Sequence, residues 1–335
     1  MPVFAFVVFK DEHEKARLLK LIKAGLFKSR IGTALYYFLN KKRFGKETDR
    51  INAGPDMEIV SAEMPFPASL LSSFDTSHIG NIIKRIGNKK GWEKCFLPGD
   101  VCDLPGLGQF SSKTIDVGII FKSLLIPLLN IISKSREIKL EDIETTIISG
   151  ENMSELLAIV SQLEPYIKYI NVAAENKKAA ENELSGFCSD TGLSAFISSD
   201  YKSVLRNSEL IINLDKEINL NNYKIKPNSI IINLSIADNS KMQGDFTVIN
   251  GLLYSFKNDL YSRLGKEICR CFDKDELTNI LMAIKAGLLD RSSGDNDEVS
   301  CGCDYSLQFV ENVNRVFRSC GGSITGLLGR RGIIN

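Results

Sequence analysis

Apolar runs and helical periodicities alternate along the second half of the chain. Short β-branched and apolar runs predict strands at residues 145–149, 169–174, 193–198, 210–214, 229–234 and 246–249. Residues 153–166, 177–188 and 201–206 between them have helical spacing or composition. Strands that alternate with helices predict βαβ units, and unbroken apolar runs predict strands covered on both faces. We therefore expect an α/β fold with a doubly wound, mostly parallel sheet in the C-terminal half.

The pattern is less regular on either side of this region. It predicts strands at 4–9 and 58–63, helices at 12–27 and 34–40, and a loop at 96–108. We expect an N-terminal region that is either α/β or helical, then an apolar helix at 115–132 and a linker at 133–144. Helices are predicted at 252–272, 276–289 and 305–317, with a polar loop at 292–298. The glycine-rich tail after 320 is predicted to be mobile at its end.

Composition excludes several classes of protein. Lys and Arg total 42 against 41 Asp and Glu, and 44% of residues are hydrophobic, so the chain is neither disordered nor a polytopic membrane protein. Without a basic excess we expect no nucleic-acid partner. The start lacks the features of a signal peptide, and eight scattered cysteines fit a cytoplasmic protein with reduced thiols. Asp116 and Lys122 make the 115–132 segment a buried helix rather than a membrane span, with peripheral membrane contact as an alternative; the oligomeric state is left open.

The turn after the strand at 145–149 is a candidate nucleotide site. Phosphate sites at such turns use glycines and a helix N-terminus, and here Gly150 alone remains of a G-x-G-x-x-G pattern. Glu175 follows the second strand, where a carboxylate grips ribose hydroxyls and disfavours a 2′-phosphate. NAD or NADP is the expected cofactor, and the alternative is a tight turn at Gly150 with a solvated Glu175. The candidate cofactor-binding residues are the turn and strand ends: Gly150, Glu151, Asn152, Glu175, Asn213 and Leu234.

Cysteines supply the other candidate chemistry, since His13 and His78 are the only histidines. Cys271, with Arg270 and Lys274 nearby, is a candidate nucleophile, and an inert buried thiol is the alternative. A zinc site from Cys269, Cys271, Cys301 and Cys303 is a third reading, although the C-x-C spacing is not the usual one. Glu93, beside the lone Trp92, is a candidate functional carboxylate, with packing of the Trp as the alternative.

Several short motifs occur in one order: Cys95-Phe-Leu-Pro98, an apolar helix with Lys122, Val248-Ile-Asn-Gly251 and Cys271-Phe272. In this order they resemble cyanobacterial-type long-chain acyl-[acyl carrier protein] reductases, whose Rossmann domains are similar to that of shikimate dehydrogenase. The resemblance implies a Cys271 thioester that hydride from NADPH reduces to a fatty aldehyde, with Glu93 as the matching carboxylate. The chain departs from the family in its shortened glycine-rich loop and in having Glu175 where a basic residue is usual.

The resulting prediction has three parts along the chain. Residues 1–140 form a substrate- or acyl-binding region, 141–255 a Rossmann-like nucleotide-binding domain, and 256–335 a helical closing segment and tail. The expected function is an oxidoreductase that reduces an acyl thioester, acting on a small molecule or an acyl-carrier substrate. The alternative is a catalytically inactive Rossmann-fold protein that senses a ligand or binds a partner.

Overall fold

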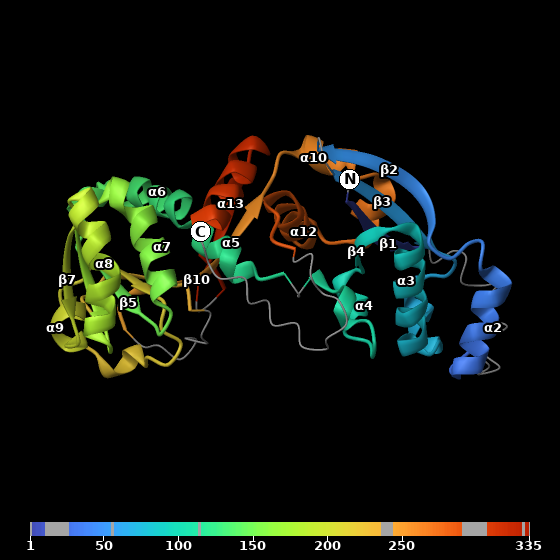
Figure 1. The fold of residues 1–335 in the computed structure, drawn as a ribbon, viewed down its shortest axis with the longest axis horizontal. Coiled ribbons are helices and arrows are strands. Elements are labelled where there is room, and N and C mark those ends of the chain that lie inside the picture. Colours follow the sequence, from blue (N-terminus) through green and yellow to red (C-terminus); the bar gives the residue numbers. More distant parts are fainter. Residues whose placement is uncertain are drawn as a thin grey trace. The chain divides into compact units, whose positions relative to one another are not determined.

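The computed structural model describes residues 2–10, 27–54, 57–112, 115–235, 244–289, 307–329 and 332–334. Nearly all of the helix predicted at 12–27, and the loop predicted at 292–298, lie outside these ranges. The chain forms two compact units (Figure 1). The N-terminal unit comprises Met1–Ile115, Phe256–Ala283 and Leu289–Val299, and the C-terminal unit comprises Asp116–Ser255, Ile284–Leu288 and Ser300–Asn335.

A four-stranded sheet lies at the centre of the N-terminal unit, in the order β2-β3-β1-β4. Its strands are β1 (Val3–Phe9), β2 (Lys46–Gly54), β3 (Met57–Met64) and β4 (Trp92–Phe96). β1 pairs in parallel with both β3 and β4, whereas β2 pairs with β3 as an antiparallel edge strand. The α/β alternative for this region is therefore confirmed.

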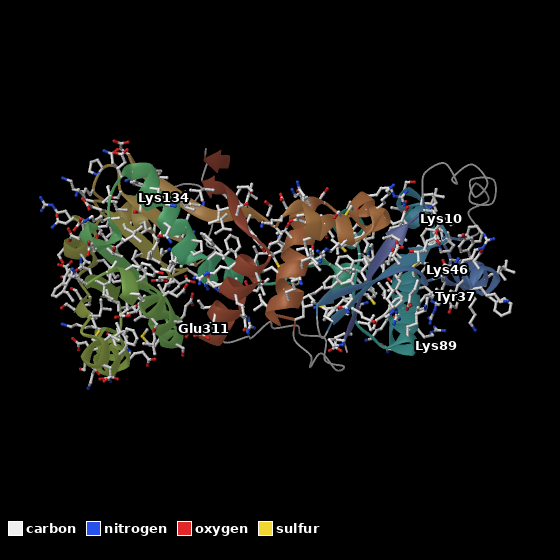
Figure 2. The ribbon with its side chains drawn as sticks, turned by 90° about the horizontal axis from the view of Figure 1, so that it is seen from above. Lys10, Tyr37, Lys46, Lys89, Lys134 and Glu311 are labelled. Atoms are coloured by element: carbon white, nitrogen blue, oxygen red, sulfur yellow. The ribbon has the colours of Figure 1, made fainter. Side chains whose placement is uncertain are left out.

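Helices cover both faces of this sheet. α3 (Thr76–Lys90) starts at the Asp75 cap and ends at Gly91 in the left-handed region, and its isoleucines join the core around Val7 and Phe9. On the other face, Phe272 packs edge-on against Phe6 with ring centroids 5.2 Å apart. The remaining helices are α2 (Arg30–Asn40), α4 (Gly99–Cys102), α10 (Asn258–Arg263), α11 (Lys266–Cys271) and α12 (Lys274–Ala286). Figure 2 shows the side chains, with Tyr37 of α2 and Lys46 of β2 labelled.

The C-terminal unit contains an eight-stranded sheet in the order β12-β11-β10-β9-β8-β5-β6-β7. Six strands run parallel: β5 (Thr145–Ser149), β6 (Tyr169–Ala174), β7 (Ser194–Ser198), β8 (Leu210–Asn213), β9 (Ile230–Asn233) and β10 (Thr247–Ser255). Numbered from β5, these six follow the order 3-2-1-4-5-6 of a Rossmann fold. The predicted doubly wound, mostly parallel sheet is confirmed.

Two helical layers enclose this sheet. α7 (Met153–Leu163) and α8 (Lys177–Thr191) follow β5 and β6 and pack on each other. α9 (Tyr201–Leu205) and the 3₁₀ turn Leu220–Asn222 place Leu205 and Leu220 in a core with Ile211 and Ile231. α5 (Val117–Ser123), α6 (Leu125–Arg136) and α13 (Leu307–Ser319) complete the unit.

The apolar segment at 115–132 is two helices rather than one. α5 and α6 meet at 54°, and most of their apolar side chains are buried. Among the described residues no single helix has the length and hydropathy to cross a bilayer, although this bent pair satisfies both criteria when counted together.

Two expectations for the end of the chain are wrong. Residues 252–255 continue β10 instead of starting a helix, because they pair with β11 (Ser323–Gly329), as in Leu252↔Leu327. The glycine-rich tail forms β11 and β12 (Gly332–Ile334), an antiparallel pair on the sheet edge. Residues 252–255 and β11 pair with each other although they are about 75 residues apart in the sequence, whereas β12 pairs with the adjacent β11.

Candidate functional site

The strand order reverses between β5 and β8. The chain proceeds from β5 to β6 and β7 on one side, and then crosses to β8 on the other side of β5. Sheets of this kind bind ligands outside the carboxyl ends of their strands at this switch point. The residues that follow β5, β6 and β8 are therefore the candidates for a binding site.

Gly150 follows β5 and lies against the end of β8. A Cβ atom at this position would be 2.8 Å from the carbonyl oxygen of Leu214, which is too close for any other residue. The same two turns are joined by the hydrogen bond from Leu214 N to Ile148 O, at 2.9 Å. Strand packing thus requires this glycine, whatever it does for a ligand.

The N-terminus of α7 already has a side-chain acceptor. Asn152 is its N-cap, and the Oδ1 atom accepts a hydrogen bond from the backbone N–H of Glu155 at 3.2 Å. Glu151 is exposed directly before the cap. One donor that a phosphate uses elsewhere is therefore occupied, and a carboxylate stands beside the others.

Glu175 is exposed at the end of β6, and the structure brings further side chains close to it. Tyr201 follows β7 and Asp215 follows β8. Burial, followed by the negative charges of Asp215 and Glu175, raises the pKa of Tyr201 to about 12. The ring of Tyr201 lies 5.8 Å from that of Tyr223. This cluster, Glu175, Tyr201, Asp215 and Tyr223, unites loops from three strands.

Sequence reasoning named Glu175 in this cluster but not Tyr201 or Tyr223 as site residues. Each of the two tyrosines lies in a loop or short helix after a predicted strand, and this position alone could have marked it as a candidate site residue. The sequence does not indicate that they lie close to Glu175.

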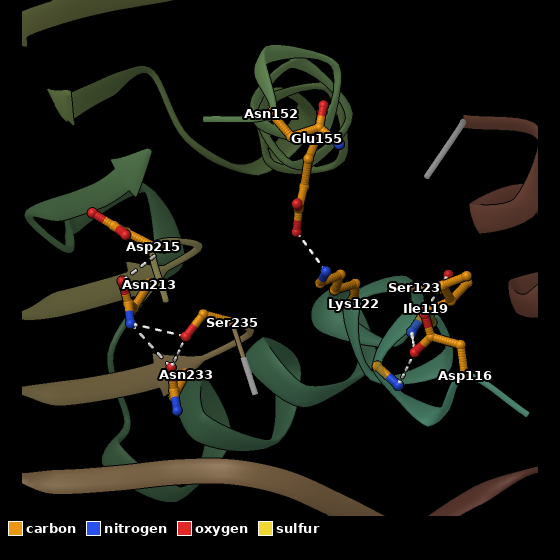
Figure 3. Close-up of polar contacts among 11 residues, drawn as sticks. Asp116, Ile119, Lys122, Ser123, Asn152, Glu155, Asn213, Asp215, Asn233 and Ser235 are labelled. Atoms are coloured by element: carbon orange, nitrogen blue, oxygen red, sulfur yellow. Dashed lines mark hydrogen bonds and ion pairs between the residues drawn. The ribbon is translucent and has the colours of Figure 1, made fainter. Parts of the chain in front are cut away.

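Asn213 is a buried structural residue at the end of β8 (Figure 3). Its Nδ2 atom donates to Asn233 Oδ1 at 3.0 Å and to Ser235 Oγ at 3.2 Å, and its Oδ1 atom accepts from Asp215 N at 3.1 Å. Asn233 continues the network by donating to Asn250 Oδ1 at 3.1 Å. Both amide hydrogens of Asn213 are thus used in fixing the strand ends, and its Oδ1 atom holds the backbone N–H of Asp215.

Leu234, the last candidate in this unit, has a fully buried side chain. Its backbone N–H donates to Asn213 O at 2.9 Å. Only its backbone carbonyl is left as a polar group for a ligand.

A buried ion pair connects α5 to the first turn of α7. Lys122 Nζ lies 2.6 Å from Glu155 Oε1, and the two side chains are only 16% and 13% exposed (Figure 3). Lys122, which the sequence marked as a charge within an apolar helix, therefore has a carboxylate partner two helices away. The pair fixes the helix that follows Gly150.

Cys271, the candidate nucleophile, ends α11 in the N-terminal unit and is partly exposed. The Sγ atom lies 3.9 Å from the carbonyl oxygen of Phe9 and 4.0 Å from Nη2 of Arg270. The same guanidinium nitrogen donates to Phe9 O and to Glu267 Oε2, both at 2.6 Å. Arg270 thus ties α11 to the end of β1 and places a cation beside the sulfur. Cys301 and Cys303, the other half of the zinc alternative, lie outside the described residues.

Glu93 is exposed on β4, and Glu47 takes the place beside Trp92. Trp92 Nε1 donates to Glu47 Oε1 at 3.1 Å. Burial by itself raises the pKa of Glu47, but hydrogen bonds from Trp92 and Arg50 and the charge of Lys90 outweigh it, so the pKa is lowered. The side chain of Glu93 forms no hydrogen bond or ion pair with any residue that the structure describes.

A separate cavity of about 250 Å³ lies between α6 and the amino ends of β8 and β9. Apolar side chains such as Leu129, Ile132 and Ile143 line it together with Arg136 and Lys226. The amino ends of the strands are the end of the sheet opposite to Gly150 and Glu175. This cavity is therefore not part of the switch-point site.

No protein-family model and no curated protein matches the sequence. Among solved structures, L-tryptophan dehydrogenase from Nostoc punctiforme aligns at 10% identity and TM-score 0.31, over 95% of this chain and 82% of that one. The A chain of dipicolinate synthase from Bacillus subtilis aligns at 10% identity and TM-score 0.32, over 84% and 93%. Shikimate dehydrogenase from Aquifex aeolicus aligns at 10% identity and TM-score 0.27, over 94% and 98%. The fold assignment rests on the strand order of the C-terminal unit and not on these likenesses.

Proposed function

We propose that the chain is an oxidoreductase-type protein whose C-terminal unit binds NAD or NADH in preference to the 2′-phosphorylated forms. One observation carries the proposal: the 3-2-1-4-5-6 sheet places Gly150 after its first strand and Glu175 after its second. Bound NADH supplies hydride, and Glu175 accepts hydrogen bonds from the ribose hydroxyls.

The adenosine end of a dinucleotide fits the residues present. The carboxylate of Glu175 is exposed, so it is free to bind a diol and to repel a 2′-phosphate. Tyr201 and Tyr223 add aromatic surface beside it, on which a base can stack. The pyrophosphate end fits less well, because Asn152 caps α7 and Glu151 adds negative charge. We therefore expect the affinity to come mainly from the nucleoside.

The finer proposal concerns the acyl step. The thiolate of Cys271 attacks the carbonyl carbon of an acyl thioester, the bond from this carbon to the carrier sulfur breaks, and the carrier leaves as a thiolate that takes a proton from water. Transfer of hydride to the new thioester then breaks its C–S bond, which yields an aldehyde and returns the thiolate. The partial exposure of Cys271 and the nearby Arg270 guanidinium support this role.

A second candidate function is a ligand-sensing or partner-binding protein without catalysis. It is favoured by the Asn152 cap and by Glu151, which together leave the helix N-terminus poorly prepared for pyrophosphate. In this case nucleosides bind, and Cys271 is an ordinary thiol.

Thermal-shift titrations with NAD, NADH, NADP and NADPH test the cofactor proposal. A ligand at a hundred times its Kd adds about 2.7 kcal/mol to the free energy of unfolding. We expect stabilisation by NAD or NADH, loss of that stabilisation in Glu175→Gln, and no loss in Glu181→Gln, an exposed carboxylate of the following helix. The proposal is wrong if no dinucleotide stabilises the protein or if the phosphorylated forms do so equally well.

The acyl step is tested by mass spectrometry after incubation with an acyl-carrier thioester. We expect an acyl adduct on Cys271 that is absent from Cys271→Ser and unchanged in Cys320→Ser, another partly exposed thiol. Equal acylation of both thiols, or none, leaves the non-catalytic function as the conclusion.

A further inference from the structure

Helix α2 presents a row of large apolar side chains to solvent. Ile31, Leu35, Phe38 and Leu39 are 82%, 55%, 73% and 72% exposed, respectively. Their spacing places all four on one face of the helix. Single exposed apolar residues are common, but a contiguous face of four marks an interaction surface.

The opposite face of α2 is firmly packed. Thr33 and Tyr36 are buried, and the Tyr36 ring contacts Phe27, Phe44, Phe66 and Phe74. Thr33 Oγ1 donates to Phe27 O at 2.6 Å and accepts from Asp75 N at 2.9 Å. The orientation of the helix is therefore fixed, and its apolar face points outward because of that packing.

Basic residues flank the apolar face at both ends of α2. From residue 28 to residue 46 the chain has no Asp or Glu, although the whole protein is nearly neutral. The basic residues in this stretch are Lys28, Arg30, Lys41, Lys42, Arg43 and Lys46. Lys28, Arg30 and the three at 41–43 are exposed and form no ion pair with any described residue.

We propose that α2 docks the protein onto an anionic lipid surface. Leu, Ile and Phe on one side of a helix with Lys and Arg beside them is the composition of helices that lie in the membrane interface. Clusters of four to eight basic residues next to such a helix attract anionic lipids. Peripheral membrane contact was the alternative for the segment at 115–132, but there the side chains of Ile119, Ile120 and Phe121 are buried inside the C-terminal unit.

Charge argues against two other occupants of this face. A second copy of the chain, bound symmetrically through the same face, would bring two strongly basic surfaces together. The preceding segment of the chain, residues 15–26, is also basic, with Lys15, Arg17, Lys20 and Lys23 and no acidic residue. An anionic bilayer supplies both the apolar interior and the negative charge that this face lacks.

Co-sedimentation of the full chain with lipid vesicles tests the proposal. We expect binding to mixed phosphatidylcholine and phosphatidylserine vesicles, little binding to pure phosphatidylcholine vesicles, and release at high salt. Leu35→Gln/Phe38→Gln should reduce partitioning by at least about tenfold, because two apolar anchors are lost. Lys41→Gln/Lys42→Gln should reduce it by roughly 25-fold, at about fivefold per basic residue.

Matched variants in the C-terminal unit serve as controls. Phe196→Gln removes an exposed aromatic residue, 51% exposed on β7, and Lys178→Gln/Lys216→Gln removes two exposed lysines. Both should bind vesicles as the wild type does. Circular dichroism and melting curves of every variant establish that it is folded, which is expected because the replaced side chains are exposed.

Three outcomes would overturn the proposal. The first is no sedimentation with anionic vesicles, and the second is sedimentation that Leu35→Gln/Phe38→Gln leaves unchanged. The third is a dimer in gel filtration that this double variant converts to a monomer, which would identify a second copy of the chain as the occupant.

Discussion

Replacing Lys122 by Met should destabilise the C-terminal unit far more than an ordinary surface substitution. At the 2.6 Å that separates Lys122 Nζ from Glu155 Oε1, an effective dielectric constant of about 20 gives an attraction of about 6 kcal/mol. Most of this attraction only offsets the desolvation of two charges that are less than one-sixth exposed. The variant keeps the desolvation of Glu155 and loses the attraction, so we expect the free energy of unfolding to fall by about 3–5 kcal/mol.

The double variant Lys122→Met/Glu155→Leu distinguishes two causes of destabilisation, the unpaired charge of Glu155 and the lost packing of the Lys122 side chain. With both charges removed, the free energy of unfolding should return to within about 1 kcal/mol of the wild type. Lys226→Met is the matched control, because Lys226 also lies 2.6 Å from its partner, Glu209, but these side chains are 45% and 42% exposed. We expect this variant to lose less than about 1 kcal/mol.

Urea unfolding followed by two signals measures these effects. Far-ultraviolet circular dichroism reports on both units, whereas the fluorescence of Trp92, the single tryptophan, reports on the N-terminal unit. The transition of the C-terminal unit should shift in Lys122→Met. The reasoning is refuted if Lys122→Met costs no more than Lys226→Met, or if the double variant is as unstable as the single one.

Three further predictions concern single positions. Gly150→Ala should lower the free energy of unfolding by about 1–3 kcal/mol in urea, since its Cβ meets Leu214 O, whereas Gly186→Ala, mid-helix with open space around it, should raise it by up to about 1 kcal/mol. Asn213→Leu should cost about 2–4 kcal/mol in the same assay, because it removes the acceptor of Asp215 N and the amide that donates to Asn233 Oδ1 and Ser235 Oγ; a neutral result would contradict the network. Burial raises the pKa of Glu276 in the folded protein. The free energy of unfolding therefore falls as the pH rises from the usual glutamate pKa to the raised one, because the unfolded state releases this proton first. The melting temperature of Glu276→Gln should not fall over this pH range as that of the wild type does. A variant with the same pH profile as the wild type would contradict the prediction.

The sequence best predicts the strands that are buried on both faces of the sheet. β5, β6, β8 and β9 are covered on both faces, so their residues form unbroken apolar runs that are legible without a partner. β2 and β4 were not predicted, because the first reads KETDRINAG at a sheet edge and the second is five residues long with two charges. β11 gives no local signal, since its glycine-containing sequence becomes a strand by pairing with β10 on one side and β12 on the other.

The candidate site divides in the same way. Glu175 could be predicted from the sequence alone, because it directly follows the second of two predicted strands. Tyr201 comes near Glu175 because α9 follows β7, whose place beside β6 depends on the strand order. The structural role of Asn213 could not be predicted from the sequence either. Its amide donates to Asn233 of β9 and to Ser235, and those contacts exist only in the assembled sheet.

Gly150 shows how a single residue can support two opposed conclusions. In the sequence, a glycine between a strand and a helix indicates a backbone that approaches phosphate. In the structure the space that its missing side chain leaves is filled by Leu214 O, so the glycine is required even if no phosphate ever binds. The evidence for a nucleotide therefore moves to Glu175, which has no packing reason to be a carboxylate. If Glu175→Gln abolishes stabilisation by NAD while Gly150→Ala only destabilises the fold, the two residues will have been separated into a ligand contact and a packing contact.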